Sequence, residues 1–456
     1  MGMTRQGNMQ QLECVSQFGI NLISYVTANI GIGHVAREIA SVILESGVPL
    51  SILDLDAGSR SKFDLSFAPY TVETAKELPY GVNLVMVGAN ALEAWMMQSL
   101  DSPANETRLN VAFLWWELPD LAPHWIEAAR GCDALIAGSE FIQATLANAV
   151  PGVPVLLARQ PVRMPQHVLP NRARFGLPAE ELLFYTGFEP YSDPIRKNPF
   201  GAIEAFQRAF PNQTNCRLVI KVNNPDAYSA SGGLLKKLYE MVRDDSRFHL
   251  LKESLPYEDL LSLYASCDVF ISLHRSEGLG MVPLEAMRLG KAVVATAWSG
   301  NMSYMNHRNA CLVTYEFQPT DDSSPLYGPS NLGIQSHWAE PDLDHAAVLL
   351  RKLATDSTFR AAIGAKAEED SARYEALARQ GDFLDELKAI WAHRELYPQR
   401  DRNLVLSRIR KARHQMHLDR LGSVRRIATE LSERFQLQMN RHILWRFQGG
   451  PKKPST

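Results

Sequence analysis

The sequence predicts an α/β protein in which two doubly wound parallel-sheet domains follow one another and face each other across a cleft. Its 456 residues exceed the roughly 250–300 residues at which a single hydrophobic core stops growing. Short apolar runs typical of strands alternate with helical stretches, and this alternation starts twice along the chain. Since apolar strands separated by helices form parallel sheets covered on both faces, the repetition indicates two such domains.

The first series of strand-like runs predicts an N-terminal Rossmann-like domain over residues 1–165. Val35, Ile39 and Val42 lie at helical spacing after the first run, and Gly47 marks the end of that helix. The strand-like runs are NLISYV (21–26), PLSILDL (49–55), NLVMVG (83–88), NVAFLWW (110–116), DALIAGS (133–139) and VPVLLA (153–158).

The second series predicts a C-terminal Rossmann-like domain over residues 175–380. It follows a stretch rich in proline and charge, residues 160–180, which is typical of an interdomain connection. Because doubly wound sheets bind ligands beyond the carboxyl ends of their strands, two such edges facing each other would form one shared site. The runs are LLFYTGF (182–188), RLVIKV (217–222), FHLLKE (248–253), DVFISLH (268–274) and AVVATA (292–297).

Composition excludes several classes of protein. With 47 Lys and Arg against 50 Asp and Glu, the chain as a whole has no electrostatic case for binding nucleic acid. Its five cysteines lie far apart without a CxxC pair, so we expect neither a disulfide framework nor a zinc cluster. No apolar run reaches about 18 residues, and the N-terminus lacks the apolar region of a signal peptide. A cytoplasmic location is therefore expected.

The remaining residues, 381–456, predict a helical C-terminal segment with a basic amphipathic tail. From Asp401 onward, 13 Lys and Arg against 4 Asp and Glu give a net charge of +9, so the first 400 residues carry −12. This tail would pack against the body of the protein, or lie peripherally on the anionic inner face of the cell membrane. Nucleic acid is a weaker alternative, since the tail has no recognisable base-reading module. One apolar stripe lies among its arginines: Leu421, Val424, Ile427, Leu431 and Phe435.

The most informative motif is HRSEGLGMVPLEAMRLG, residues 274–290. A predicted strand ends near its start, the glycine turn Gly278-Leu279-Gly280 follows, and Pro283 suits the first residue of a helix. Backbone N–H groups at a helix N-terminus form an anion site. Glu277 and Glu285 flank this turn, and carboxylates beside a phosphate cradle suit the hydroxyls of a nucleotide-sugar.

SEGLGMVPLEAM resembles the E-x7-E signature of retaining glycosyltransferases with the GT-B fold, glycosyltransferase family four. The pattern is similar nearly throughout residues 259–296, and a weaker resemblance covers about residues 20–395. In this family the first glutamate approaches the donor sugar, the second binds the donor ribose, and the amides of the glycine loop receive the diphosphate. The resemblance implies these roles for Glu277, for Glu285, and for Gly278, Leu279 and Gly280.

A second basic element is Arg196-Lys197, which follows the first strand of the second series. Adjacent cations at the mouth of a parallel sheet suit a pyrophosphate whose charge grows as the glycosidic bond breaks. The family usually has an arginine at this strand's end and a lysine several residues later. Here Phe188-Glu189 ends the strand and the arginine abuts the lysine, so the role transfers more directly to Lys197 than to Arg196.

The loop Gly31-x-Gly33-x-x-Ala36 in the first series admits two interpretations. With Asp54 and Asp56 at the end of the next strand, it matches the dinucleotide fingerprint of an NAD-dependent oxidoreductase. The family also has a glycine loop here, facing the donor phosphate, which implies donor contact for Gly33. Asp54-Leu55-Asp56 also mimics a D-x-D metal motif, but its place at a strand end makes a metal site improbable.

Three further residues complete the candidate site. Glu117 lies in the aromatic and acidic stretch WWELPDLAPHW (115–125), a composition that can hold a sugar by stacking and paired hydroxyls. His34 lies at the start of the first helix. Glu117 and His34 are both candidates for contact with the acceptor. Asn301, in the turn after the run 292–297, is a candidate for donor contact.

Together with this resemblance, these residues predict a retaining hexosyltransferase. It would move a hexose from a nucleoside-diphosphate sugar to a hydroxyl of a saccharide or lipid-linked acceptor, as in surface polysaccharide assembly. The resemblance implies no cofactor and no metal, because the helix dipole, the glycine amides and Lys197 would stabilise the diphosphate. Two alternatives remain: the NAD-dependent oxidoreductase, and a non-catalytic scaffold that retains only the fold.

Overall fold

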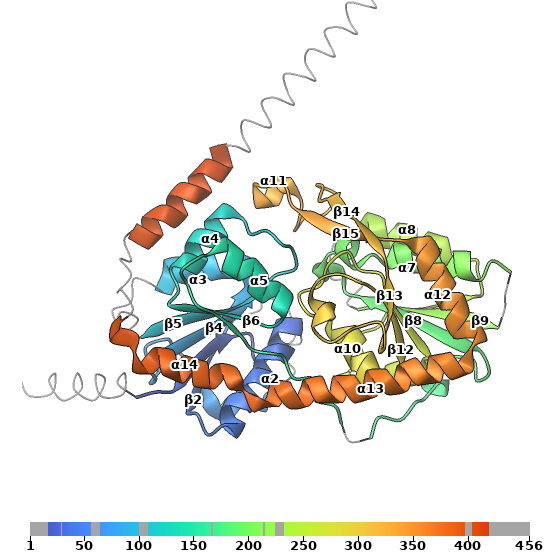
Figure 1. Ribbon diagram of the computed structural model, residues 1–456, viewed down its shortest axis with the longest axis horizontal. Helices are drawn as coiled ribbons and strands as arrows, with labels where there is room; N and C mark the ends of the chain where they lie inside the picture. Colours follow the sequence, from blue (N-terminus) through green and yellow to red (C-terminus); the bar gives the residue numbers. More distant parts are fainter. Residues whose placement is uncertain are drawn as a thin grey trace, which may run out of the picture.

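The protein has two α/β domains side by side, as Figure 1 shows for the computed structural model. The structure describes residues 17–28, 30–55, 64–99, 108–165, 167–212, 215–223, 232–396 and 404–418. In these residues the first sheet has seven parallel strands in the order β3-β2-β1-β4-β5-β6-β7, and the second has six in the order β10-β9-β8-β11-β12-β13. The expected fold class, two Rossmann-like domains with a helical extension, is confirmed.

The N-terminal domain buries both faces of its sheet, since its strands are apolar on both sides. One hydrophobic cluster includes Val35, Ile39 and Val42 of the first described helix, as the spacing predicts. Its strands are β1 (Ile20–Ser24), β2 (Leu50–Asp54), β3 (Thr71–Val72), β4 (Val82–Gly88), β5 (Leu109–Trp115), β6 (Ala134–Ala137) and β7 (Val155–Leu157). Its helices are α2 (Gly31–Glu45), α3 (Ala89–Ser99), α4 (Pro123–Arg130) and α5 (Glu140–Ala149), with the 3-10 turn η1 (Ala68–Tyr70).

The second domain repeats this architecture, and its five predicted strands all form. The sixth strand, β13, has only three residues and was not predicted. The strands are β8 (Leu182–Phe188), β9 (Cys216–Val222), β10 (Phe248–Leu251), β11 (Val269–Ser272), β12 (Ala292–Thr296) and β13 (Cys311–Val313). The helices are α6 (Pro194–Lys197), α7 (Pro199–Ala209), α8 (Gly232–Val242), α9 (Tyr257–Ser266), α10 (Met281–Arg288), α12 (Leu343–Thr355) and α13 (Ser357–Gln380). The 3-10 turns are η3 (Ala173–Phe175), η4 (Pro190–Ser192) and η6 (Gly300–Ser303).

An insertion after β13, which the sequence does not predict, forms an antiparallel hairpin. It consists of β14 (Tyr315–Pro319), a loop containing the short helix α11 (Pro329–Leu332), and β15 (His337–Pro341). We call residues 315–341 the arm. Figure 1 shows the arm reaching from the second domain towards the first.

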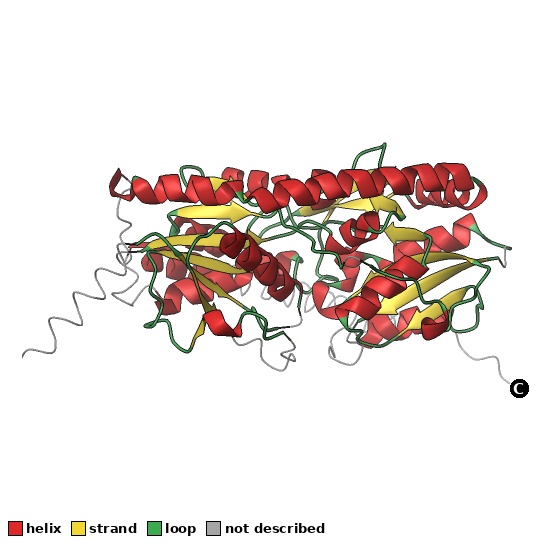
Figure 2. Cartoon of the chain, turned by 90° about the horizontal axis from the view of Figure 1, so that it is seen from below, coloured by secondary structure: helices red, strands yellow, loops and turns green. Residues whose placement is uncertain are grey.

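The chain returns to the N-terminal domain after the second domain is complete. Helix α13 runs along the second domain, and α14 (Asp382–Ala392) continues it along the first domain after Gly381, which has a φ of +68° (Figure 1 and Figure 2). The buried side chains of α14, including Leu387 and Trp391, join the hydrophobic cluster beneath α2. After η7 (Arg394–Leu396), a further helix spans 404–418 and buries Leu406 and Ile409 against the N-terminal domain.

Other sequence expectations concern the tail and the cysteines. The apolar stripe from Leu421 to Phe435 lies outside the described residues. In the described ranges, no helix is both long and apolar enough to span a membrane. The four cysteines that the structure describes are free and buried.

Candidate functional site

Three loops bring the predicted residues together where the two domains meet. In the second sheet, strand order reverses between β8 and β11, which pair directly while β9 and β12 lie on their outer sides. Ligands of doubly wound sheets bind at the carboxyl ends of the strands at such a reversal. The loop after β8 carries Arg196 and Lys197, and the loop after β11 carries Glu277. The loop after β12 packs against the loop after β11, because Gly300 N–H donates to the carbonyl of Glu277 at 2.9 Å.

A strained turn holds Arg196 and Lys197. Asp193 and Asn198, at the two ends of α6, have φ values of 62° and 52°, in a region that most side chains avoid. The Asp193 carboxylate compensates by accepting hydrogen bonds from the N–H groups of Ile195 and Arg196. The Asn198 side-chain amide donates to the carbonyl of Leu273 at 2.9 Å, which anchors the turn to β11.

Glu277 pairs with both cations. Its Oε1 lies 2.5 Å from Lys197 Nζ, and its Oε2 lies 3.1 Å from Nη1 of Arg196. Burial alone would raise the pKa of Glu277, but the charges of Lys197 and Arg196 outweigh burial and lower this pKa to about 2. Glu277 is therefore an anion at neutral pH. The cations also lie beside His274, whose pKa burial lowers to about 4, so that its imidazole is neutral.

The glycine turn presents its backbone amides at the start of α10. This helix begins at Met281, two residues before Pro283, so the expected helix start was wrong by that margin. Within the described chain, the N–H groups of Leu279, Gly280 and Met281 donate to no protein acceptor. Gly280 has a φ of +84°, which a residue with a side chain rarely adopts. The turn thus has the geometry of a helix N-terminal anion site.

Glu285 is buried in the second turn of α10 and has the opposite electrostatics to Glu277. Burial raises the pKa of its carboxyl group to about 8, although the Tyr257 hydroxyl donates to Oε1 at 3.0 Å. The Tyr257 ring lies 5.1 Å from the ring of His34, at the start of α2 in the other domain. Burial also lowers the pKa of His34 to about 4. One carboxyl is thus kept charged and the other neutral, a division typical of sites with distinct roles for two acids.

Glu285 should make stability fall as pH rises. The folded protein binds its proton more tightly than the unfolded chain, because the pKa is about 8 instead of 4.5. The free energy of unfolding therefore decreases from pH 4.5 to 8. Urea unfolding at pH 6.5 and pH 8 should show that Glu285→Gln removes a decrease on the order of 2 kcal/mol. An unchanged pH slope in the variant would show that Glu285 does not carry this proton.

The loop after β12 supports the glycine turn from behind. Ser299 is the third non-glycine residue with positive φ in the described chain, at 74°, and its Oγ accepts from Glu277 N–H at 2.8 Å. A Cβ atom on Gly300 would lie 2.0 Å from the carbonyl oxygen of Gly278. Asn301 is fully buried, and its amide donates to the carbonyl of Thr296 at 2.9 Å.

The N-terminal domain contributes Gly33, Glu117 and Ser139 to the same region. Gly33 packs so tightly that a Cβ atom would lie 2.3 Å from the carbonyl oxygen of Ala28. The Ser139 hydroxyl, at the start of α5, donates to the carbonyl of Gly278 at 2.6 Å. Glu117 Oε1 lies 3.9 Å from Nη2 of Arg196. The Asp54 carboxylate accepts from the N–H and the hydroxyl of Thr27, whereas Asp56 lies outside the described residues.

The structure thus joins Arg196, Lys197, Glu277 and Glu117 in one network, with the glycine turn beside it. The His34 ring contacts the ring of Tyr257, whose hydroxyl donates to Glu285. The sequence suggests the turn that contains Ser299 and Asn301 as a donor contact. It gives no signal for Tyr257, whose hydroxyl donates to Glu285, or for Tyr327, whose hydroxyl donates to Glu117. Among the described residues, no cluster of His, Cys, Asp and Glu could hold a metal ion.

Comparisons with known proteins show which family and which solved structures this chain is similar to. Residues 193–321 match the family described as glycosyl transferases group 1. HepE of Anabaena, solved with UDP and glucose, has 17% identity and a TM-score of 0.56, over 82% of this chain and 100% of its own. Sucrose-phosphate synthase of Thermosynechococcus elongatus has 15% identity and a TM-score of 0.58, over 82% and 100%. OtsA has 12% identity and a TM-score of 0.57, over 81% and 99%. No curated protein matches by sequence.

The structural likenesses, all under 25% identity, establish the fold. The family match covers the segment that carries Arg196, Lys197, Glu277, Glu285 and Asn301. Residues 193–321 of the second domain thus match glycosyl transferases group 1, and the chain as a whole has the GT-B fold.

Proposed function

We propose that this protein is a retaining glycosyltransferase. It moves a hexose from a nucleoside-diphosphate sugar to a hydroxyl of a saccharide or lipid-linked acceptor, in the assembly of a surface polysaccharide. The observation that carries the proposal is that Lys197 and Arg196 both pair with Glu277, which directly precedes the glycine turn. In the described structure the amides of that turn donate to no protein acceptor. Such a concentration of positive charge suits a diphosphate leaving group.

The charges of the site fit the departure of a diphosphate. Glu277 pairs with both Lys197 and Arg196, and its single negative charge offsets only part of their two positive charges. A bound diphosphate would share these cations with Glu277, and it would gain charge as the bond to the sugar breaks. The helix dipole and the amides of the glycine turn add positive potential without a metal. We therefore propose that the reaction needs neither metal nor cofactor.

The two glutamates would take different parts of the donor. Glu277, ionised and beside the cations, would accept hydrogen bonds from the hydroxyls of the hexose. Glu285, deeper and beside Tyr257, would bind the ribose. We name no protein nucleophile, because in the proposed mechanism the leaving phosphate helps to deprotonate the acceptor on the same sugar face. Contacts between the domains, such as that of Ser139 with Gly278, would exclude water and limit donor hydrolysis.

A panel of nucleotides tests the proposal. UDP, GDP, ADP, dTDP and NAD would each be measured by thermal shift and calorimetry, with and without magnesium, on wild type and Glu285→Ala. A ligand at 100 times its Kd stabilises the folded protein by about 2.7 kcal/mol. We expect one nucleoside diphosphate to bind without metal and the variant to lose it. Binding of NAD alone, unaffected by Glu285, would establish the oxidoreductase, and absence of donor turnover with every acceptor would support the scaffold.

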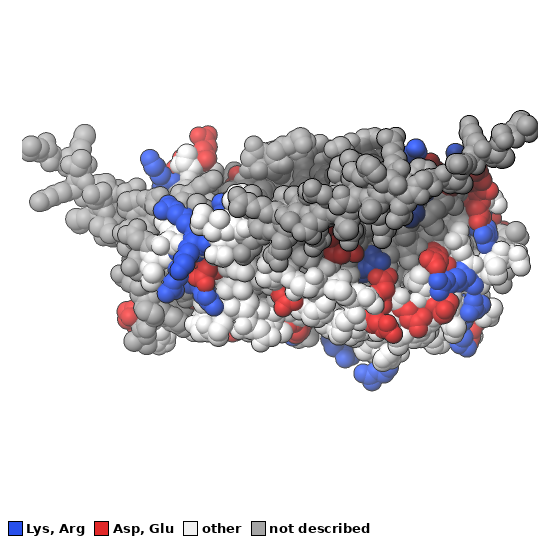
Figure 3. Space-filling view, turned by 90° about the horizontal axis from the view of Figure 1, so that it is seen from above, with Lys and Arg blue, Asp and Glu red and all other residues white. Residues whose placement is uncertain are grey.

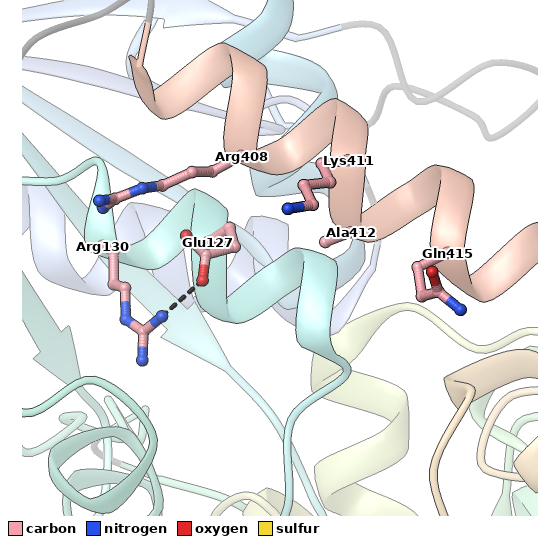
Figure 4. A pocket seen from close by; sticks show the side chains of 6 residues that line it. All are labelled: Glu127, Arg130, Arg408, Lys411, Ala412 and Gln415. Carbon is pink, nitrogen blue, oxygen red and sulfur yellow. Dashed lines mark hydrogen bonds and ion pairs between the residues drawn. The ribbon is translucent and has the colours of Figure 1, made fainter.

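We also propose that helix 404–418 rests on an anionic membrane surface. The helix contains no Asp or Glu, and its Arg408, Arg410 and Lys411 are exposed. Figure 3 shows Lys and Arg side chains gathered at the left of the upper face, where the N-terminal domain lies. Beside α4, a groove of about 460 Å³ is lined by Arg408, Lys411 and Arg130, the last paired with Glu127 (Figure 4). A lipid-linked acceptor would then lie in the same membrane.

Vesicle sedimentation checks this surface. Each Lys or Arg near an anionic bilayer contributes about 1 kcal/mol, so Arg408→Ala with Lys411→Ala should weaken binding to phosphatidylglycerol vesicles roughly 30-fold. The matched control is Lys236→Ala with Arg243→Ala, two exposed cations of the second domain. Equal binding to pure phosphatidylcholine vesicles, or equal loss in both double variants, would contradict a membrane role for this face.

A further inference from the structure

The arm joins the two domains close to Arg196. Tyr327, Leu332 and Trp338 belong to the arm, yet their side chains are buried in a hydrophobic cluster of the N-terminal domain. A polar contact also joins the arm to the N-terminal domain, because the Ser336 hydroxyl donates to Asp120 Oδ2 at 2.8 Å. The arm therefore attaches the second domain to the loop that follows β5.

Tyr327 is the residue of the arm that reaches the site. Its hydroxyl donates to Glu117 Oε2 at 2.7 Å, and its ring centroid lies 5.4 Å from that of Trp116. The guanidinium of Arg196 lies 5.5 Å from the centre of the same ring. Burial raises the pKa of Tyr327 well above its usual value, so that the hydroxyl stays protonated and remains a donor.

The Glu117 carboxylate lies near the Arg196 guanidinium but forms no hydrogen bond with it. The Ser276 hydroxyl of the second domain donates to the backbone carbonyl of Glu117, which fixes the main chain. The Glu117 carboxylate nevertheless stops 3.9 Å from Nη2 of Arg196, beyond hydrogen-bonding distance, because its other oxygen takes the Tyr327 hydroxyl. Arg196 Nε is buried without a hydrogen-bond partner in the described structure.

We propose that Tyr327 is a positioning residue that restrains Glu117 and thereby keeps the charge of Arg196 available for the donor diphosphate. If Tyr327 lost its hydroxyl, the freed carboxylate would close on Arg196 and neutralise it. Seating of the arm on the N-terminal domain would thus complete the diphosphate site. This inference rests on the proposed function of the site and adds a specific role for a residue outside the matched segment, which ends at 321.

A second-site rescue tests the inference. Calorimetry would measure the Kd of whichever of UDP, GDP, ADP and dTDP binds wild type most tightly, with no acceptor present. We expect Tyr327→Phe to weaken binding at least fivefold. Adding Glu117→Gln should restore the affinity to that of Glu117→Gln alone, because the amide carries no charge to neutralise Arg196. Donor turnover at saturating acceptor should show the same rescue in kcat/KM.

Tyr315→Phe is the matched control, since Tyr315 is an aromatic residue of the same arm whose hydroxyl makes no hydrogen bond in the described structure. It should bind as wild type does. Wild-type affinity in Tyr327→Phe, or a double variant weaker than Tyr327→Phe, would overturn the positioning role and leave the proposed function intact. If wild type bound none of the four nucleotides, the proposed function would fail and the inference with it.

Discussion

Lys197→Ala should lower kcat by about 10²–10³-fold, or roughly 3–4 kcal/mol in transition-state stabilisation. Lys197 Nζ contacts Glu277 directly, and its side chain is about a quarter exposed, so it is positioned to meet a ligand. Desolvation lowers the pKa of Lys197, but the charge of Glu277 opposes that effect. Without this cation, the departing diphosphate would face only Arg196 and the amides of the glycine turn. Steady-state kinetics with the donor identified by the nucleotide panel would measure the loss.

The matched control is Lys352→Ala. Lys352 pairs with Asp356 on the surface of α12 and is half-exposed. Surface ion pairs contribute little, so this variant should keep its activity and change stability by less than about 1 kcal/mol. A Lys197→Ala enzyme with undiminished kcat would remove Lys197 from the catalytic group. Thermal unfolding of both variants separates loss of fold from loss of chemistry.

Gly300→Ala should destabilise the protein by about 2–3 kcal/mol and abolish nucleotide binding. The new Cβ atom would lie 2.0 Å from the carbonyl oxygen of Gly278 and 2.6 Å from the backbone nitrogen of Leu279. Both atoms belong to backbone, which cannot rotate away as a side chain can. The glycine turn, which directly follows Glu277 and its partner Lys197, would therefore move together with its backbone amides. Urea unfolding and calorimetry with a nucleoside diphosphate measure the two effects.

Gly233→Ala is the corresponding control. Gly233 lies in helix α8, and a Cβ atom there would meet nothing within 4 Å. Alanine favours helix over glycine by about 0.8–1 kcal/mol, so this variant should be as stable as wild type or more so. If Gly300→Ala bound nucleotide normally, the glycine turn could not be the diphosphate site.

The sheets and the donor half of the site could be predicted because their signals are local. Buried parallel strands are apolar along their whole length, as in NLVMVG, and so stand out from the helices between them. Glu277 and Glu285 lie within one motif of nine residues that also contains the glycine turn. The opposite shifts of their pKa values could not be predicted. The pKa of Glu277 is lowered by the charges of Lys197 and Arg196, which lie about 80 residues away along the chain, whereas burial raises the pKa of Glu285.

The arm could not be predicted for a different reason. Tyr327 stands among Pro, Gly and Ser, a composition typical of a surface loop, and nothing local indicates that its ring is buried. The positive φ values of Asp193 and Asn198 could not be predicted from the sequence either, because they depend on the hydrogen bond that anchors Asn198 to Leu273. Features of this kind arise only when distant segments meet, and they lie at the functional end of the sheets.

The return of α14 to the first domain has a consequence for synthesis on the ribosome. A Cβ atom on Gly81 would lie 2.1 Å from the ring of Trp391, so the two surfaces fit closely. Until residue 392 has been translated, one face of the first sheet lacks the side chains of α14 that cover it. The first domain to be synthesised is therefore the last to be completed. Nascent chains arrested before that point should expose an apolar surface where chaperones bind.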